Sequence, residues 1–305
     1  MDHFEPDVAT AKRDVASRLA HRLSDAHCSI AASAPAGDEI GFICSTFVRY
    51  TLPHRKPPGH TFERRDGSRV ITFMSPPHIG LPYGKVPRLL LIHLTTQAVR
   101  TRQRDIDLGV SMSSLMRLVG ETVTGGANGS VGAFKDQVLR TVSMTATTSL
   151  DTAEASQLQN APSADEFEIS WTALSSDKRS GLPAKIRLGE RIFEEMLDSA
   201  VPLDMRAVRA VRQSPLAMDL YSWFTFRMHR FRTDRPVQIP WADLQKQFGS
   251  AYRFESDFKI AFRSALKQVQ LVYPALRCAA RDSHLVVHRS PTSVSAVARR
   301  SAASR

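Results

Sequence analysis

The sequence is poor in cysteine and lacks any long apolar run. Only three cysteines occur in 305 residues, namely Cys28, Cys44 and Cys278. Such few, scattered thiols exclude a disulfide framework, and their odd number favours a reducing compartment. No apolar run approaches the roughly 18 residues that a membrane span needs, and the acidic start MDHFEPDVAT has no secretory core. We therefore expect a soluble cytoplasmic protein, associated with the nucleoid or a plasmid, without a membrane partner.

Patterns of catalytic and cofactor sites are also missing. No His-x-His pair exists to supply the metal ligands of a rolling-circle initiator, so the tyrosines are assigned to packing. His284 and His288 lie four residues apart on a predicted strand, without a cysteine or acid to complete a ligand set. Residues 80–85 approach a nucleotide-binding P-loop, but the motif is one residue short and Val86 replaces the Mg²⁺-binding hydroxyl. We expect no catalytic residues, no metal and no cofactor.

Acidic residues are scarce in the last third of the chain. Residues 205–305 contain 18 Lys+Arg and 6 Asp+Glu, whereas residues 1–204 contain 23 and 24. The net charge of +11 and the pI of about 10.0 therefore arise from the C-terminal part. A basic excess confined to one region favours a polyanionic partner, which here indicates DNA.

Residues 214–290 have the pattern of a helix, a strand, two helices and a hairpin. Ser214 and Pro215 supply the N-cap and first-turn proline of a helix that reaches residue 231. The elements predicted after it are a strand at 237–239, helices at 240–249 and 254–273, and a hairpin of residues 276–279 and 284–288. This order is typical of a winged helix-turn-helix, whose second long helix enters the major groove of DNA.

The predicted helix at residues 254–273 has a phenylalanine-rich face and an opposite face of hydrogen-bond donors without acids. Such a cationic face is also typical of a simple solvated surface, and the basic C-terminal third shifts the balance toward DNA. The DNA-binding residues predicted in this region are Arg253, Ser256, Lys259, Arg263, Lys267, Gln270 and Arg281.

A second copy of the pattern precedes the first in the chain. A hairpin is predicted at 61–74 before it. The elements of the copy are a helix at 87–102, a strand at 106–108, a short helix capped by Ser111, a helix at 130–147, and a wing of residues 166–174 and 184–188. The glycine-rich loop at 125–129 offers N–H groups to a DNA phosphate, and a plain flexible turn is an equal alternative. The DNA-binding residues predicted here are Gly126, Asn128, Ser130, Lys135, Arg140, Lys178 and Arg179.

The repetition predicts an α+β, mostly helical chain with two tandem winged helix-turn-helix domains. The predicted boundaries are an N-terminal extension at 1–60 that is partly helical or flexible, a first domain at 61–188, a connecting segment at 189–213, a second domain at 214–290, and a basic tail at 291–305. The connecting segment contains an amphipathic stretch that should dock the domains. The tail is rich in serine and alanine, and we expect it to be disordered.

Two segments resemble plasmid replication initiators of the RepA type. One is LPYGKVPRLLL at residues 81–91, followed by TTQAVR at 95–100. The other is SPLAMDLYSW at residues 214–223, followed by IPWADL at 239–244 and QFG at 247–249. The resemblance implies a protein with two winged-helix domains that binds repeated double-stranded DNA at a plasmid origin. It also implies the host replicative helicase and host initiator proteins as partners, and leaves monomer or homodimer open.

Two other functions are compatible with part of this pattern. A winged-helix transcriptional repressor, including one that represses its own gene, would use the same domains to block a promoter. A nucleic-acid enzyme would instead show metal-dependent cleavage or ATP turnover. Gene context distinguishes initiator from repressor, since an initiator gene should lie beside direct repeats and an AT-rich segment.

Overall fold

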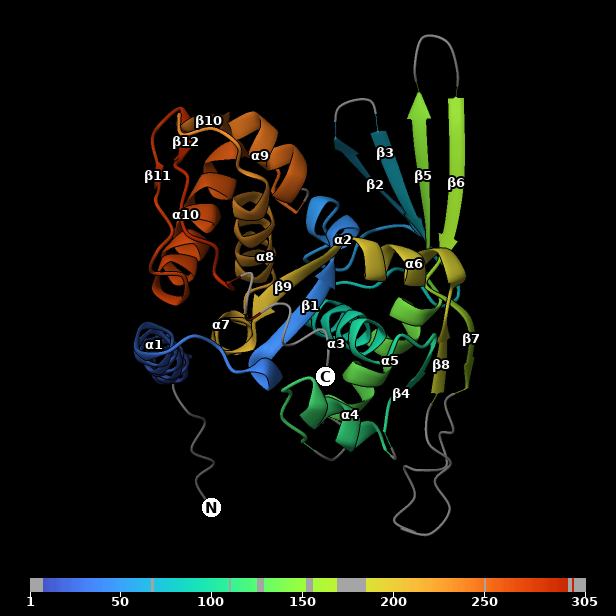
Figure 1. Ribbon diagram of the computed structural model, residues 1–305. Helices are drawn as coiled ribbons and strands as arrows, with labels where there is room; N and C mark the ends of the chain where they lie inside the picture. The colour runs from blue at the N-terminus through green and yellow to red at the C-terminus, as the bar shows by residue number, and fades with distance from the viewer. Residues whose placement is uncertain are drawn as a thin grey trace, which may run out of the picture.

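A computed structural model of the chain describes residues 8–66, 69–109, 111–124, 129–151, 156–168, 185–249, 251–295 and 298. Two units of similar order lie on either side of a central pair of strands (Figure 1). The elements that precede the first unit are α1 (Val8–Ala32), a short 3-10 helix (Gly37–Glu39), β1 (Ile40–Cys44), α2 (Ser45–Arg49), β2 (Thr61–Asp66) and β3 (Arg69–Met74).

The first unit follows the predicted order of elements, although residues 169–174 and 184 of the predicted wing lie outside the described ranges. It consists of α3 (Lys85–Thr101), β4 (Asp105–Asp107), α4 (Met112–Leu118), α5 (Ser130–Val142), β7 (Ala164–Glu168) and β8 (Lys185–Leu188). Its antiparallel sheet has the strand order β4-β8-β7. The predicted cap of α4 is confirmed, since the Ser111 hydroxyl accepts a hydrogen bond from the Ser114 amide at 3.1 Å.

The second unit repeats this arrangement. It consists of α8 (Pro215–Arg230), β10 (Val237–Pro240), α9 (Trp241–Phe248), α10 (Glu255–Val272), β11 (Cys278–Ala280) and β12 (His284–Val287), with the strand order β10-β12-β11. The Ser214 cap is present, with its hydroxyl 3.2 Å from the Ala217 amide. Buried aromatic rings join the helices, and those of Trp241 and Phe262 meet edge to face at 5.2 Å. In both units the second strand of the hairpin pairs with the strand that follows the first helix.

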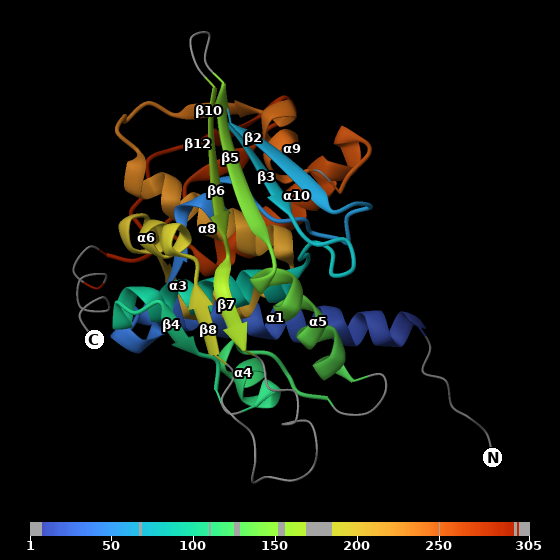
Figure 2. The ribbon, with the colours of Figure 1, turned by 90° about the vertical axis from the view of Figure 1, so that its right-hand side faces the viewer.

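A four-stranded sheet of order β2-β3-β5-β6 accompanies the first unit and corrects one prediction (Figure 2). The helix expected to reach residue 147 ends at Val142, because β5 (Thr145–Asp151) pairs with β3 in the register Met74↔Thr145. The apolar spacing of α5 continues by chance into this threonine-rich strand. β6 (Ser156–Pro162) completes a hairpin that no local sequence signal had indicated.

The predicted N-terminal extension and connecting segment meet in the centre of the molecule. The connecting segment forms α6 (Glu190–Asp198), β9 (Ala200–Asp204) and α7 (Met205–Val211), and β9 pairs antiparallel with β1. The predicted N-terminal extension thus contains α1, β1 and α2. Arg206 on α7 donates hydrogen bonds to the carbonyls of Ser29 and Ser33 at 3.1 and 3.0 Å, which fastens α1.

The first residues of the predicted disordered tail are packed against the core. Tyr273 donates a hydrogen bond to the Pro291 carbonyl at 2.6 Å, and the hydroxyls of Thr225 and Ser293 lie 3.0 Å apart. Val294 is fully buried in an apolar cluster with Phe42 on β1 and Val99 on α3. The segment 291–295 thus links the second unit to β1 and α3, contrary to the prediction of disorder there.

Residues 81–91 adopt a conformation that depends on glycine. Gly84 has φ +77°, a left-handed value that L side chains rarely adopt, and it immediately precedes α3. Its carbonyl accepts a hydrogen bond from Arg88 Nη1 at 2.6 Å.

None of the helices in the described ranges is both long and apolar enough to cross a membrane.

His93 makes the stability of the protein depend on pH. His93 on α3 has its Nε2 buried without a hydrogen bond within the described part of the chain, and burial, with a contribution from Arg100, lowers its pKa to about 4. The unfolded chain takes up this proton near pH 6.5, whereas the folded chain does not until about pH 4. The free energy of unfolding is therefore unaffected by His93 above about pH 6.5. It decreases as the pH falls from there toward 4, because the unfolded chain binds a proton that the folded chain does not.

Replacing His93 by glutamine should reduce this pH dependence. We expect the free energy of unfolding to fall with pH less steeply in H93Q than in wild type, by about 1.4 kcal/mol per pH unit between pH 6 and pH 5. Urea denaturation at several pH values measures both slopes. H78Q, a change at an exposed histidine, is the control, and equal slopes for H93Q and wild type would contradict the prediction.

Candidate nucleic-acid interface

Helix α10 buries its phenylalanine face as predicted. Phe258, Phe262 and Val269 have no exposed surface. Lys259 forms an ion pair with Glu255 at 2.6 Å, and its ammonium group lies 5.7 Å from the centre of the Trp241 ring. The side chain of Lys259 is 25% exposed, so its charge is held at the edge of the helix and still reaches solvent.

The hairpin turn packs against one edge of α10. Arg263 Nη2 donates hydrogen bonds to the Arg281 carbonyl at 3.2 Å and to Asp282 Oδ1 at 3.3 Å. Trp241 Nε1 donates to the same Arg281 carbonyl at 3.1 Å. Gln270 donates to the Cys278 carbonyl at 3.2 Å. Arg263 and Gln270, both predicted as DNA contacts, thus also hold the hairpin against the helix.

The most exposed residues of α10 form a line along the helix. This line is rotated about the helix axis by part of a turn from the predicted DNA-binding face. It runs along Ser256, Ile260, Ser264, Lys267 and Leu271, which are all exposed. The predicted residues Lys259, Arg263 and Gln270 lie on the flank of this line, beside the hairpin, and are half-buried. The prediction followed polarity alone and missed Ile260, which is 68% exposed. Arg253 and Arg281 are exposed at the two ends of the same region.

Ser130 and Arg140, which were predicted as DNA contacts in the first unit, have partners within the protein. The Ser130 amide donates to Thr124 Oγ1 at 2.9 Å, and the Ser130 hydroxyl donates to the Thr122 carbonyl at 2.9 Å. Arg140 pairs with Asp136 at 2.7 Å and its side chain is only 13% exposed. Lys135 is half-buried on α5. The remaining predicted residues, Gly126, Asn128, Lys178 and Arg179, lie outside the described residues.

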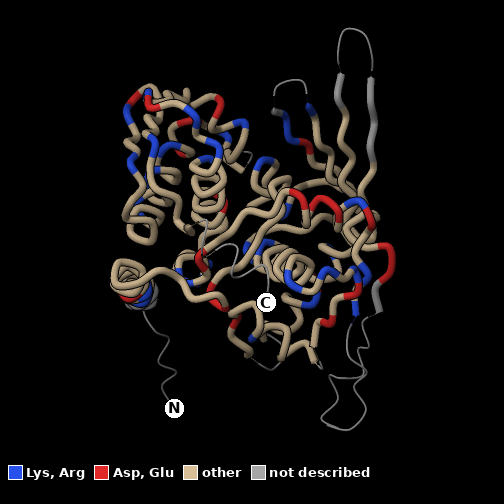
Figure 3. Tube along the Cα trace, in the orientation of Figure 1, with Lys and Arg blue, Asp and Glu red and all other residues tan. Residues whose placement is uncertain are grey.

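A second basic surface lies at the C-terminal end of α8 and was not predicted. It surrounds an open hollow of about 690 Å³ lined by Arg232, Arg277 and Arg289 among other residues. The guanidinium groups of Arg227 and Arg230 stack over the rings of Trp223 and Phe226 at 5.0 and 4.8 Å. The arginine-rich sequence RMHRFRTDR at residues 227–235 could have indicated this basic surface. Lys and Arg are accordingly spread over the helices and hairpin of the second unit in Figure 3.

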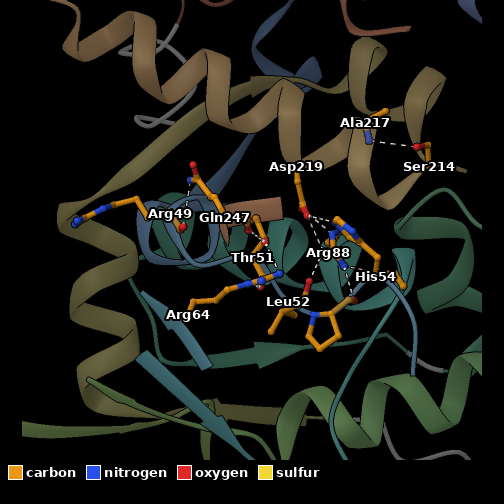
Figure 4. Close-up of polar contacts among 12 residues, drawn as sticks. Arg49, Thr51, Leu52, His54, Arg64, Arg88, Ser214, Ala217, Asp219 and Gln247 are labelled. Carbon is orange, nitrogen blue, oxygen red and sulfur yellow. Dashed lines mark hydrogen bonds and ion pairs between the residues drawn. The ribbon is translucent and has the colours of Figure 1, made fainter. Parts of the chain in front are cut away.

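The two units are joined by a buried ion pair between α3 and α8 (Figure 4). Arg88 donates from Nε and Nη2 to the two carboxylate oxygens of Asp219, each at 2.7 Å. His54 Nε2 contacts Asp219 Oδ2 at 2.8 Å, and Arg88 Nη2 also donates to the Leu52 carbonyl at 2.7 Å. The side chains of all three ionisable residues are less than 10% exposed. These contacts of Arg88, Asp219 and His54, which we call the joint, fix α8 relative to α3.

The residues of the joint influence one another's protonation states, as the pKa values of Asp219 and His54 indicate. Burial opposes ionisation of Asp219, but the charge of Arg88 and hydrogen bonds from His54 and Arg88 hold its pKa below the ordinary value. Burial lowers the pKa of His54, although Asp219 opposes this. A carboxylate paired with Arg88 and a neutral His54 are therefore the expected forms at neutral pH.

A second set of hydrogen bonds extends the joint to α9 and β2. Arg64 on β2 donates from Nε to the Thr51 carbonyl at 3.1 Å and from Nη1 to the Lys246 carbonyl at 3.3 Å. Thr51 donates to the Gln247 carbonyl at 3.0 Å, and Gln247 donates to the Arg49 carbonyl at 3.3 Å. Burial lowers the pKa of Arg64 to about 10. Sequence reasoning identified none of these residues.

The joint connects the two segments on which the family resemblance depends. Arg88 belongs to residues 81–91 and Asp219 to residues 214–223, which are far apart in the chain and paired in space. Within the described ranges, no three histidine, cysteine or acidic side chains gather as a metal-binding group would. The ion pair of Arg88 and Asp219 links these two segments across the two units.

One solved structure shares this fold. A crystal structure of domains 2 and 3 of RctB superposes with a TM-score of 0.53 over 80% of this chain and 98% of that chain, at 10% sequence identity. A second structure of RctB domains 2–3 gives a TM-score of 0.47 over 78% of this chain and 92% of that one, at 12% identity. At this identity the first likeness concerns the fold alone. No curated protein sequence matches the chain.

The arrangement is thus that of a two-unit α+β protein whose units share one order of strands and helices. The family described as "Plasmid encoded RepA protein" matches residues 81–242, which is more than half of the chain. The matched region includes both Arg88 and Asp219. The chain belongs to this family of plasmid replication proteins, as the resemblance of its two segments predicted.

Proposed function

We propose that this chain is a plasmid replication initiator that binds repeated double-stranded DNA at its origin through two tandem winged-helix units. The observation that carries the proposal is the surface of α10 and the hairpin turn, where Lys267, Arg253 and Arg281 are exposed beside Lys259 and Arg263. A helix followed by a hairpin with cationic side chains at both is the arrangement by which a winged helix enters the major groove. Membership in the RepA family supports replication initiation as the role of this binding.

The similarity of the two units supports a protein that binds DNA with both units in tandem. The strand orders β4-β8-β7 and β10-β12-β11 are equivalent, and each sheet accompanies two successive helices. In this proposal α5 and α10 are the helices that enter DNA, and the hairpins β7–β8 and β11–β12 are the wings. The basic excess of the C-terminal third gives the second unit the larger electrostatic share.

Host replication proteins are the proposed partners at the origin. An initiator without catalytic groups acts by bringing other proteins to the DNA that it binds, which assigns the unwinding step to the host replicative helicase and host initiators. Origin DNA should therefore be bound by the purified chain alone, without nucleotide or metal.

Fluorescence anisotropy with a duplex that carries one origin repeat tests the proposal. We expect binding at least about 10³-fold tighter than to a scrambled duplex at physiological salt. Equal affinity for both duplexes would contradict sequence-specific origin binding.

Lys267 gives the electrostatic test of the same surface. If its ammonium group contacts a phosphate, Lys267→Ala should weaken binding to every duplex and reduce the slope of log affinity against log salt by about one. Arg209→Ala, which removes an exposed charge on α7, is the matched control. A variant K267A with the wild-type slope would remove this end of α10 from the interface.

A further inference from the structure

An aliphatic side chain stands at the centre of the exposed line of α10. Ile260 is 68% exposed and, at about 3.6 residues per turn, lies opposite the buried residues Phe258, Phe262 and Val269. Five large hydrophobic side chains are exposed among the described residues, and three of them, Phe254, Ile260 and Leu271, lie on α10 or at its cap. The helix that is proposed to enter DNA is thus also where exposed apolar groups concentrate.

The neighbours of Ile260 are suited to a DNA groove. Ser256 and Ser264, one turn before and after it, are exposed and carry hydroxyls that hydrogen-bond to any base edge. Lys259 and Arg263 flank it on the hairpin side, Lys267 continues the line, and Asp257 is exposed on the opposite side. Small polar groups beside the isoleucine match bases in the centre of the groove, and the cations on the hairpin side match phosphates at its rim.

The position of Ile260 along the helix indicates contact with bases. It lies in the N-terminal half of α10, and residues in that part of a recognition helix contact base edges. The C-terminal end is occupied on one side by α1, since the ring of His27 contacts the Leu271 carbonyl at 2.8 Å. Ile260 has neither donor nor acceptor, and the apolar group that DNA offers in the major groove is the C5-methyl of thymine.

We infer that Ile260 reads a thymine methyl group in the major groove, so that the chain prefers an A·T pair at the contacted position. The inference rests on the proposed function. A second copy of this chain is the alternative occupant of the apolar site. The cationic flank disfavours it, because two copies would bring the same positive charges together.

Exchange of thymine for deoxyuridine tests the inference, because it removes only the methyl group. Each thymine of one origin repeat is replaced in turn, and affinity is measured by anisotropy for wild type and for Ile260→Ala. We expect one or two positions at which uracil weakens wild type by about fourfold, which corresponds to about 0.8 kcal/mol for one methyl group. I260A should already be weaker on thymine and should respond to uracil at those positions by less than twofold.

Alanine is a better helix former than isoleucine, so I260A should keep α10 folded, and circular dichroism verifies this. Leu271→Ala is the matched control, since it truncates a 43% exposed aliphatic residue at the other end of α10 and should retain the wild-type response to uracil.

Three outcomes would overturn the inference. These are no wild-type response to uracil at any position, an equal response in I260A and wild type, and a change of I260A from dimer to monomer in sedimentation with unchanged DNA binding. Failure of wild type to prefer the repeat over scrambled DNA would instead overturn the proposed function itself.

Discussion

Replacing Asp219 by alanine should lower the free energy of unfolding by about 3–5 kcal/mol at pH 7. The change leaves the Arg88 guanidinium buried, with carbonyl acceptors but without a counter-charge, and removes the partner of His54 Nε2. Because the pKa of Asp219 is held below its ordinary value, the stabilisation is complete above that value and is lost as pH falls through the folded pKa. Urea denaturation followed by circular dichroism measures the loss.

Two variants give this experiment its controls. Arg289→Ala removes an ion pair with Asp234 of similar length, 2.8 Å, whose side chains are 60% and 87% exposed. Its effect should be below about 1 kcal/mol, because exposed pairs gain little over their hydration. The double change of Arg88 to Met and Asp219 to Leu should recover much of the stability lost in D219A, because it leaves no unpaired charge. A loss in D219A as small as that in R289A would show that the pair does not hold the units together.

The helices of the second unit could be predicted because their signals are local. Ser214 with Pro215 begins α8, and Gly249 follows the end of α9, so cap and turn chemistry within a few residues determine those ends. The spacing of the phenylalanines likewise determines which face of α10 is buried. Elements of this kind need only the residues that form them.

The strands and the joint depend on partners that are remote in the sequence. β1 is a strand because it pairs with β9, and β5 leaves the helical pattern of α5 because β3 lies beside it. The ion pair of Arg88 and Asp219 joins residues 131 positions apart, so no window of sequence contains it. The exposed residues of α10 were misjudged for a different reason, because the prediction followed polarity alone and did not place the hairpin against one edge of the helix.

The buried contacts between the units determine how the two predicted reading helices are spaced. The ion pair of Arg88 and Asp219 joins α3 of the first unit to α8 of the second, and Val294, which follows the second unit, packs against Val99 on α3. If α5 and α10 occupy successive major grooves on one side of the duplex, their contacts lie about 10.5 bp apart. A monomer should then protect a directly oriented site of about 20 bp in hydroxyl-radical footprinting.

Changing the spacing within one origin repeat should have the largest effect on affinity. Insertion of about 5 bp between the two contact centres turns the second onto the opposite side of the duplex, and affinity should fall by roughly 10³-fold or more, toward the non-specific level. Insertion of about 10 bp restores the side of the duplex but not the distance, and a rigid joint should leave affinity low. A repeat of unchanged length with a scrambled spacer should bind as the natural one. Full recovery with 10 bp would show that the units move independently, whereas a footprint of about one turn, or one confined to inverted half-sites, would indicate a symmetric dimer in place of a tandem reader.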